Sequence, residues 1–464
     1  MGNDPSPATV PGSVNHDLII VGGGAGGLGA ARAASWAGAD VLLVNDGPLG
    51  GDCTFTGCVP SKTLIAAASQ GLSFSAAMQR VAETVDRIAA GETADVLRGE
   101  GVAVKEGRAR LTGPGSVAVG DERHSAPRII IATGGRPSVP PIPGLDDVEV
   151  LTNETVFSMT QAPASLGIIG GGPIGSELAQ AFAGLGVAVT LFEGLPRLLS
   201  REEPTASAVV EAALTAAGVA VRTSAKIERV EPRAGEIALV TAEGETVVEK
   251  LLMAVGRLPN SAGFGLEEIG VELDSRGHIV TNDRLETGVG GVFAVGDVTG
   301  KLPFTHAADE MGRLATGNAL KKGVRGRFRT SWIPWVTFTN PEVARIGMTE
   351  AEAADHGGRV ADLPMSEMDR AITDGRTEGF VKLIFGPKTL TRNAFGGQVL
   401  GATIVAPRAG EMIHEIALAM RTKMFAGRIA QTVHAYPTWS YAVQKAAGQF
   451  FGEVEGREAR RARK

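Results

Sequence analysis

The stretch Asp17-Leu18-Ile19-Ile20-Val21-Gly22-Gly23-Gly24-Ala25-Gly26-Gly27 decides the fold class of this chain. Its first five residues form an apolar run without polar alternation, which predicts a buried parallel strand. Gly22, Gly24 and Gly27 follow with G-x-G-x-x-G spacing, and an alanine-rich helical segment extends to about Trp36. A glycine turn between strand and helix favours an α/β fold in which the helix N-terminus binds a dinucleotide pyrophosphate.

The same pattern occurs a second time further along the chain. Gly170, Gly172 and Gly175 repeat the spacing after an apolar run and before a helical segment. One such motif is weak evidence, whereas two motifs, each between a strand and a helix, predict two dinucleotide sites. The predicted elements around the second turn are a strand at Leu166–Ile169, a helix at Ser176–Ala183 and a strand at Val187–Phe192.

Polar residues at the end of the second strand of each unit are candidates to bind ribose. Glu193 lies 18 residues past Gly175, where an acid binds a ribose 2′-hydroxyl and disfavours a 2′-phosphate, so the sequence favours NADH over NADPH. Arg197 nearby weakens this preference. In the first unit, Asn45 and Asp46 occupy the equivalent place, although Asp46 also suits the turn that follows it.

Both cysteines of the 464-residue chain lie in one run, Gly50-Gly51-Asp52-Cys53-Thr54-Phe55-Thr56-Gly57-Cys58-Val59-Pro60-Ser61-Lys62. Two scattered cysteines would be interpreted as small buried apolar residues. A pair five residues apart, placed directly after a dinucleotide-binding unit, instead predicts a redox-active disulfide. Cytosolic disulfides are usually catalytic or redox-sensing.

Composition limits the other possibilities. The length suggests about three domains at ~150 residues each. A net charge of −6 gives no indication of a nucleic-acid partner, and no apolar run approaches the ~20 residues that span a membrane. Two cysteines do not make a secreted disulfide framework, and the Pro- and Ser-rich start lacks the apolar region of a signal peptide, so we expect a cytoplasmic protein.

These features together resemble the class I pyridine nucleotide–disulfide oxidoreductases, from about Asp17 to Phe450. The resemblance rests on the two glycine motifs, the Gly-Gly-x-Cys-x4-Cys-x-Pro-Ser-Lys run, the Ala132-Thr133-Gly134 run and the Ala294-Val295-Gly296-Asp297 run. Within the family, the chain resembles the mercuric-reductase-like and dihydrolipoamide-dehydrogenase-like branches. Three details are most similar to the mercuric-reductase-like branch: the Gly-Gly-Asp-Cys sequence, the run 334–339 and the run 434–438. The implied fold class is α/β, with two Rossmann-like domains and a C-terminal α+β domain. The implied domains are an FAD-binding domain (16–151 and 283–334), an NAD(P)-binding domain (152–282) and a dimerisation domain (335–452). From composition we also expect a disordered leader (1–15) and a solvated basic tail (453–464).

The resemblance also implies where the cofactors bind. FAD would lie on the first domain, with Asp297 bonded to its ribityl chain and the helix near His306 directing its N-terminus at the flavin. NADH or NADPH would lie on the second domain. The other expected FAD contacts are Gly22, Gly24, Gly27, Asn45, Asp46, Lys62, Ala109, Thr133 and Gly134, and the expected NAD(P)H contacts are Gly170, Gly172, Gly175, Glu193 and Gly256.

By the same resemblance, Cys58 would face the flavin as a thiolate and Cys53 would attack the acceptor. Lys62 would lie beside the flavin and pair with Glu177 of the second nucleotide helix. The family works as a homodimer with a shared active site, because the last domain of one chain completes the site of the other.

The C-terminal region departs from the disulfide-reducing members, which carry His-x-His-Pro and a glutamate five residues after the second histidine. Tyr436 and Tyr441 stand at those two positions. A reference pKa of about 10 for tyrosine, against about 6.5 for histidine, leaves roughly one tyrosinate per thousand at pH 7. Tyr436 would therefore be a poor base but could still donate a hydrogen bond, and His434 is either a second catalytic candidate or a structural histidine.

The predicted function is transfer of electrons from NAD(P)H through flavin to a Cys53–Cys58 disulfide and then to a small-molecule acceptor. The acceptor could be a disulfide, a metal ion, a quinone or another electrophile. We assign no metal-binding residues, because no cysteine follows Cys58. The alternatives are a mercuric-reductase-type enzyme and a flavoprotein redox sensor that does not turn over.

Overall fold

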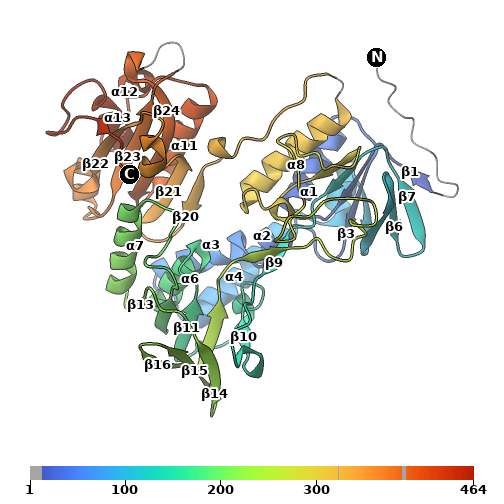
Figure 1. Cartoon of the computed structure of the whole chain (residues 1–464). Coiled ribbons are helices and arrows are strands. Elements are labelled where there is room, and N and C mark those ends of the chain that lie inside the picture. The colour runs from blue at the N-terminus through green and yellow to red at the C-terminus, as the bar shows by residue number, and fades with distance from the viewer. Residues whose placement is uncertain (1–12, 322, 389–392) are drawn as a thin grey trace.

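The computed structural model describes residues 13–321, 323–388 and 393–464. Figure 1 shows three bodies of secondary structure: one in blue, teal and yellow, one in green, and one in orange and red. The first two are built on parallel sheets and the third on an antiparallel sheet. The predicted α/β class with a third α+β part is confirmed. No helix in the described part of the chain is long and apolar enough to cross a bilayer.

The first body is organised around a parallel five-stranded sheet. Its central strand, β2, is completely buried, which explains the absence of polar alternation in the sequence. Helices α1 (Ala25–Trp36) and α8 (Thr305–Leu320) pack against each other so closely that a Cβ at Gly312 would lie 2.2 Å from the Gly26 carbonyl oxygen. The strand order is β19 (Val292–Ala294), β8 (Ile129–Ile131), β2 (Leu18–Val21), β3 (Val41–Asn45) and β4 (Ala103–Glu106).

Four more helices and a small sheet belong to the same part of the chain. Helices α2 (Gly51–Phe55) and α3 (Cys58–Ser69) carry the two cysteines, and α4 (Phe74–Ala89) packs on α3. The buried faces of α3 and α4 pack into the core of the second body, next to α6 (Pro173–Gly184). Helix α5 (Ala94–Gly99) precedes β4. The small sheet has the order β1 (Val14–Asn15), β7 (Glu122–Ser125), β6 (Ser116–Val119) and β5 (Ala109–Gly113).

The second body repeats the arrangement. Its parallel sheet has the order β10 (Val150–Leu151), β17 (Lys250–Met253), β11 (Ser165–Ile169), β12 (Ala188–Phe192) and β13 (Ala220–Arg222). Helix α6 (Pro173–Gly184) follows β11 as α1 follows β2, and α7 (Pro204–Ala216) follows β12. An antiparallel sheet that the sequence analysis did not predict projects from this body: β14 (Arg229–Arg233), β15 (Glu236–Thr241) and β16 (Gly244–Val248).

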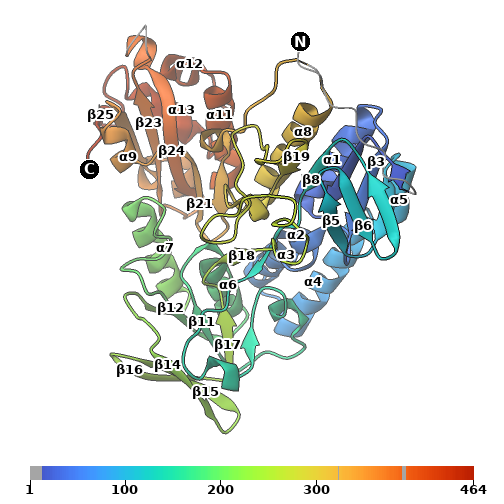
Figure 2. The ribbon, with the colours of Figure 1, turned by 45° about the vertical axis from the view of Figure 1, so that its right-hand side comes forward.

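A two-stranded ribbon joins the two nucleotide-binding bodies. Strand β9 (Gly135–Pro137) pairs antiparallel with β18 (Arg257–Pro259). Strand β9 follows β8 of the first sheet, and β18 follows β17 of the second, so the ribbon pairs the segments that leave these two strands. Figure 2 shows this crossing near the middle of the molecule, next to α2 and α3.

The third body is a six-stranded antiparallel sheet covered by helices. Its order is β20 (Trp335–Thr337), β21 (Glu342–Gly347), β24 (Gln398–Ala406), β23 (Phe380–Gly386), β22 (Arg359–Pro364) and β25 (Arg460–Arg461). The helices are α9 (Glu350–Ala354), α10 (Asp369–Thr373), α11 (Ala409–Arg421), α12 (Ala426–Gln431) and α13 (Tyr441–Gly448).

Two predictions about the chain ends need correction. Residues 1–12 of the predicted disordered leader lie outside the described residues, but Val14–Asn15 form β1, because they pair with β7 through backbone hydrogen bonds. The basic tail is not simply solvated. Arg460–Arg461 pair with β22, and the Arg460 guanidinium contacts Glu350 and Asp362.

Candidate active site

A cavity of about 1030 Å³ lies where all three bodies meet. The segments that follow the carboxyl ends of four neighbouring parallel strands line it: Gly22–Gly26 after β2, Asn45 and Asp46 at β3, Ala132–Gly135 after β8, and Val295–Asp297 after β19. Ligands of open α/β sheets bind at such an edge. The volume is at the upper end of the ~300–1,000 Å³ typical of small-molecule sites.

The two glycine turns are built alike, and the glycines within each turn are needed for different reasons. A Cβ at Gly27 would lie 1.8 Å from the Gly22 carbonyl oxygen, and a Cβ at Gly175 would lie 1.8 Å from that of Gly170. The third glycine of each motif therefore permits contact between helix and turn. Gly24 and Gly172 instead face open space, with no atom within 4 Å of an added Cβ.

The first turn fits an FAD pyrophosphate. Gly24 is the N-cap of α1 and no side chain caps this helix, so its first backbone N–H groups face the open space beside Gly24. Of the predicted FAD contacts, Gly22, Gly24, Asn45, Asp46, Lys62, Thr133, Gly134, Asp297 and His306 line the cavity. Gly27 lies beneath the turn, and the side chain of Ala109 is buried in the core, so the predicted contact of Ala109 with FAD stays a prediction.

The structure adds detail at two expected FAD contacts: the N-terminus of α8, and the pair Asn45 and Asp46. Helix α8 has no side-chain cap, and Thr305 and His306 of its first turn line the cavity. His306 Nε2 lies 2.6 Å from the Pro334 carbonyl oxygen. Asn45 accepts from the Gly23 N–H at 2.7 Å and donates to the Gly47 carbonyl, which leaves the exposed Asp46 as the freer ribose partner.

The two cysteines are free thiols that face the cavity from neighbouring helices. Cys58 begins α3, and its Sγ lies 3.3 Å from Thr305 Oγ1. A hydrogen bond from Cys53 contributes most to lowering the pKa of Cys58 to about 6. Thr305 and the charge of Lys62 also lower it, against the effect of burial. The same Cys58 contact and burial raise the pKa of Cys53. In the reduced pair, Cys58 is therefore the thiolate and Cys53 the thiol.

Lys62 and Glu177 form an ion pair between the two nucleotide-binding bodies. Lys62 Nζ lies 2.7 Å from Glu177 Oε2, and the Glu177 side chain is 5 % exposed. Phe338 of the third body holds both partners: its backbone N–H donates to Glu177 Oε1 at 2.8 Å, and its ring centroid lies 4.7 Å from Lys62 Nζ. The structure thus brings Cys53, Cys58, Lys62 and Glu177 together in one cavity wall.

At the second nucleotide turn, Glu193 accepts two backbone N–H groups, from Gly171 at 2.7 Å and from Leu195 at 2.8 Å. This arrangement parallels that of Asn45 in the first unit. The predicted NAD(P)H contacts Gly170, Gly172, Gly175, Glu193 and Gly256 do not line the cavity, but Pro173 and Ile174 at the start of α6 do. The cavity therefore extends from the first nucleotide turn to the edge of the second.

Tyr436 and His434 lie apart from this cavity in the same chain. The Tyr436 side chain is largely exposed, and its hydroxyl donates to Asp369 Oδ2 at 2.7 Å. His434 is held by Glu415 Oε2 at 2.9 Å and by the Thr432 carbonyl. Burial lowers the pKa of His434, but the contacts with Glu415, Thr432 and Gln444 together outweigh burial, and the pKa is raised overall. Their catalytic roles stay predictions.

Comparison with known proteins agrees with this geometry. Residues 16–312 match the family described as pyridine nucleotide-disulphide oxidoreductase, and residues 333–447 match its dimerisation domain. The chain belongs to the pyridine nucleotide-disulphide oxidoreductase family. It is an NAD(P)H-dependent flavin disulfide oxidoreductase, and the FAD that the family binds supplies the two-electron link between the nicotinamide and the cysteine pair.

Several family members are similar over nearly the whole chain. A dihydrolipoyl dehydrogenase of Thermus scotoductus is 35% identical over 93% of this chain and 96% of its own. A mercuric reductase of Bacillus cereus is 34% identical over 96% of this chain and 73% of its own. The Cu(II) complex of the HOCl-induced flavoprotein disulfide reductase RclA from Escherichia coli superimposes with a TM-score of 0.85 at 29% identity, covering 94% of this chain and 99% of that chain.

Sequence reasoning about this oxidoreductase missed Thr305, Phe338 and Arg257 as site residues. Thr305 opens a predicted helix, but its contact with Cys58 spans 247 positions. Phe338 lies in the run 334–339 that carries the family resemblance, and Arg257 directly follows the expected nucleotide contact Gly256. Arg257 contacts both Asp52 and Asp297. Nothing local in the sequence marks these contacts, because each joins segments that only the fold brings together.

Proposed function

We propose that this oxidoreductase passes the electrons of NADH to a thiophilic metal ion, such as Cu(II) or Hg(II), at the Cys53–Cys58 pair. The protonated Tyr436 hydroxyl supports this proposal. This hydroxyl donates to Asp369, and this bond raises the pKa of Tyr436 above its usual 10. A tyrosine held protonated in this way does not accept a proton from Cys53, and disulfide exchange requires a thiolate.

A soft metal ion removes the need for that base. Coordination deprotonates a thiol outright, so the raised pKa of Cys53 is no obstacle to metal binding. Cys58 begins as the thiolate, and the neighbouring Cys53 provides the second sulfur. The reaction balances as NADH + 2 Cu(II) → NAD⁺ + 2 Cu(I) + H⁺, or as NADH + Hg(II) → NAD⁺ + Hg(0) + H⁺. A relative named mercuric reductase and a similar structure described as the Cu(II) complex of a flavoprotein disulfide reductase support this choice of acceptor.

The acceptor is tested by anaerobic NADH oxidation with Cu(II), Hg(II), lipoamide, oxidised glutathione and a benzoquinone. We expect metal-dependent turnover that Cys53→Ser abolishes, weak turnover of both disulfides, and a gain in disulfide turnover in Tyr436→His/Tyr441→Glu. Rapid reduction of a small disulfide by the wild type would contradict the proposal. Fast quinone turnover that survives in Cys53→Ser, without metal turnover, would identify a quinone reductase instead.

We propose that the enzyme prefers NADH, because the Arg197 guanidinium is bonded within the protein and is not available to bind a 2′-phosphate. This guanidinium donates to the carbonyls of Ser200 and Glu202 and to the Ser207 hydroxyl at 2.6–2.9 Å. Glu193 therefore faces the ribose without that cation, and its charge would repel a 2′-phosphate. We expect kcat/KM to favour NADH, and Glu193→Gln to raise the relative efficiency with NADPH roughly tenfold, ~1.4 kcal/mol. Equal use of both nicotinamides by the wild type would contradict this.

We also propose that two copies share the active site, with the exposed Tyr436 of one chain lying beside Cys53 of the other. The matched dimerisation domain supports a homodimer. In a Cys58→Ser background, Tyr436→Cys should give a disulfide-linked dimer on a non-reducing gel, whereas Trp36→Cys, at another exposed aromatic position, should not. Equal cross-linking of the two variants would contradict a shared site.

A working dithiol fits the reducing cytoplasm, where we place the enzyme. Subcellular fractionation tests this location, and recovery of the protein outside the cytoplasm would contradict it.

A further inference from the structure

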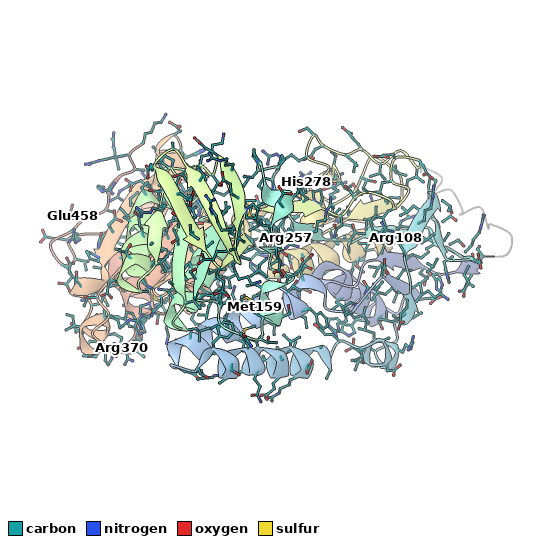
Figure 3. All side chains as sticks on the ribbon, turned by 90° about the horizontal axis from the view of Figure 1, so that it is seen from below. Arg108, Met159, Arg257, His278, Arg370 and Glu458 are labelled. Atoms are coloured by element: carbon teal, nitrogen blue, oxygen red, sulfur yellow. The ribbon has the colours of Figure 1, made fainter. Side chains whose placement is uncertain are left out.

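Arg257 joins three segments around the cavity with one guanidinium group. Nη2 contacts the Asp52 carboxylate and donates to the Gly135 carbonyl at 2.7 Å, and Nε donates to Asp297 Oδ2 at 3.1 Å. The side chain is 19 % exposed. Figure 3 shows Arg257 near the middle of the molecule, at the crossing between the nucleotide-binding bodies. The residue thus ties together the cysteine helix α2, the ribbon strand β9 and the segment after β19.

The charge of the cavity makes this arginine unusual. Among the described residues that line the cavity, Lys62 and Arg257 are the two lysine or arginine side chains, against seven aspartates and glutamates. Lys62 is paired with Glu177. Arg257 is therefore the cation that remains to balance Asp52 and Asp297, both of which line the same cavity.

Asp52 lies close to the turn that fits the pyrophosphate. Its neighbour Gly51 packs so tightly that an added Cβ would lie 3.0 Å from Gly24 Cα, and the Gly50 N–H donates to the Gly23 carbonyl at 2.9 Å. A free carboxylate at this position repels an anion bound at the N-terminus of α1. The aspartate in the Gly-Gly-Asp-Cys run thus acts against FAD binding unless a cation neutralises it.

We propose that Arg257 is a positioning residue whose positive charge offsets the negative charges of Asp52 and Asp297 and so permits the cavity to hold the anionic pyrophosphate of FAD. Burial supports this role. Burial raises the pKa of Asp297, and the positive charge of Arg257 acts in the opposite direction by favouring the ionised carboxylate. Burial also acts against the charge of Arg257, but Asp52 and Asp297 outweigh it and its pKa is raised, so the guanidinium stays cationic.

The experiment measures FAD binding to apoprotein by quenching of flavin fluorescence, in low and in high salt. The variants are Arg257→Gln, Asp52→Asn and their double mutant. Arg136→Gln is the matched control, because Arg136 lies on the same ribbon but donates to the Pro259 carbonyl and the Asn260 side chain. Circular dichroism of each apoprotein checks the fold.

We expect Arg257→Gln to weaken FAD binding about tenfold or more, with a smaller deficit in high salt because salt screens the repulsion. Asp52→Asn should bind at least as tightly as wild type, the double mutant should recover part of the loss, and Arg136→Gln should bind like wild type.

Wild-type affinity in Arg257→Gln would overturn the proposal. A deficit in Arg257→Gln that does not change with salt would also overturn it, since loss of a merely structural contact would have that result. If Arg257→Gln does not fold, Asp52→Asn decides alone: weaker FAD binding by that variant overturns the proposal, and equal or tighter binding supports it.

Discussion

Cys58 and Cys53 differ in proton affinity because their neighbours differ. Cys58 begins a twelve-residue helix and contacts the hydroxyl of Thr305, and both features favour a thiolate. Cys53 lies in the short helix before it, where the contact with Cys58 and burial favour the thiol. At the scale of single residues, the reduced pair therefore holds its negative charge on Cys58, whose pKa the charge of Lys62 also lowers.

The contribution of Thr305 can be measured in Thr305→Val, which keeps the shape and removes the hydroxyl. Without this hydrogen bond, the pKa of Cys58 should rise above about 6, by roughly 1 unit at ~1.4 kcal/mol per unit. The pH midpoint of Cys58 alkylation by iodoacetamide should move up accordingly, with mass spectrometry separating the two cysteines. Thr63→Val is the control, because the Thr63 hydroxyl bonds the Val59 carbonyl one turn along the same helix. An unchanged midpoint in Thr305→Val would refute the assignment.

At the scale of elements, the two strand–turn–helix units show how one sequence motif serves two needs. Gly27 and Gly175 are required by the protein itself, because any side chain would meet a turn carbonyl. Gly24 and Gly172 are not required for packing, since the space beside them is open. The open glycines leave room for the ligand, and the crowded ones keep the helix N-terminus close enough to reach it.

This difference separates folding from FAD binding. Gly24→Ala should leave the thermal stability of the apoprotein unchanged and abolish FAD binding, because its methyl group enters the space of the pyrophosphate. Gly27→Ala should destabilise the apoprotein by about 1–3 kcal/mol or more, through overpacking. Gly317→Ala, in α8 with open space around it, is the helix control and should be neutral or slightly stabilising. Equal stability of Gly27→Ala and Gly317→Ala would show that the close approach of Gly27 to the Gly22 carbonyl oxygen does not restrict the side chain at this position.

The sequence predicted elements well where local pattern decides them. The strand before Gly22, the helix after it and the same units around Gly170 were predicted to within a few residues, because apolar runs and glycine spacing are local signals. The antiparallel sheet β14–β16 and the tail strand β25 were missed. Polar residues interrupt the short apolar runs of β14–β16, although Val230, Ile237 and Leu239 are buried. The pairing of β25 depends on a partner elsewhere in the chain, as when Arg460 pairs with Val360.

The residues of the site likewise fall into those that local sequence motifs predict and those that only the fold brings together. Cys53, Cys58, Lys62 and Glu177 could be predicted as a group because motif residues carry them, and the fold does bring them to one cavity. Arg257 and Phe338 could not be predicted, since a guanidinium or a ring takes its role from the segments that fold around it. Tyr436 lies outside the cavity of its own chain, so a role for it beside Cys53 requires a second copy of the chain.

At the scale of the whole molecule, a network of buried charges connects the second body, the third body and the tail. Lys382 of β23 lies 3.3 Å from Glu203 at the start of α7 and 2.9 Å from Glu350. Arg460 of the tail strand contacts the same Glu350, and also Asp362 at 2.8 Å. Breaking such a buried pair costs more than breaking an exposed one, because a charge is left without its partner. The network therefore holds the second body against the third body.

Glu350 makes this connection dependent on pH. Burial acts to raise the pKa of Glu350, but Arg460 and Lys382 outweigh it and lower the pKa from its usual 4.5 to about 2. Since the folded-state pKa is the lower one, the ionised carboxylate stabilises the fold fully above about pH 4.5, and this stabilisation is lost as the pH falls toward 2. Urea unfolding of Glu350→Gln should therefore show a stability deficit of ~1–3 kcal/mol at pH 7 that shrinks steadily below pH 4.5. Asp355→Asn, which removes the exposed ion pair with Lys464, should cost ~0–1 kcal/mol at pH 7. A Glu350→Gln deficit that is the same at pH 3 and pH 7 would mean that the side chain acts through packing and not through its charge.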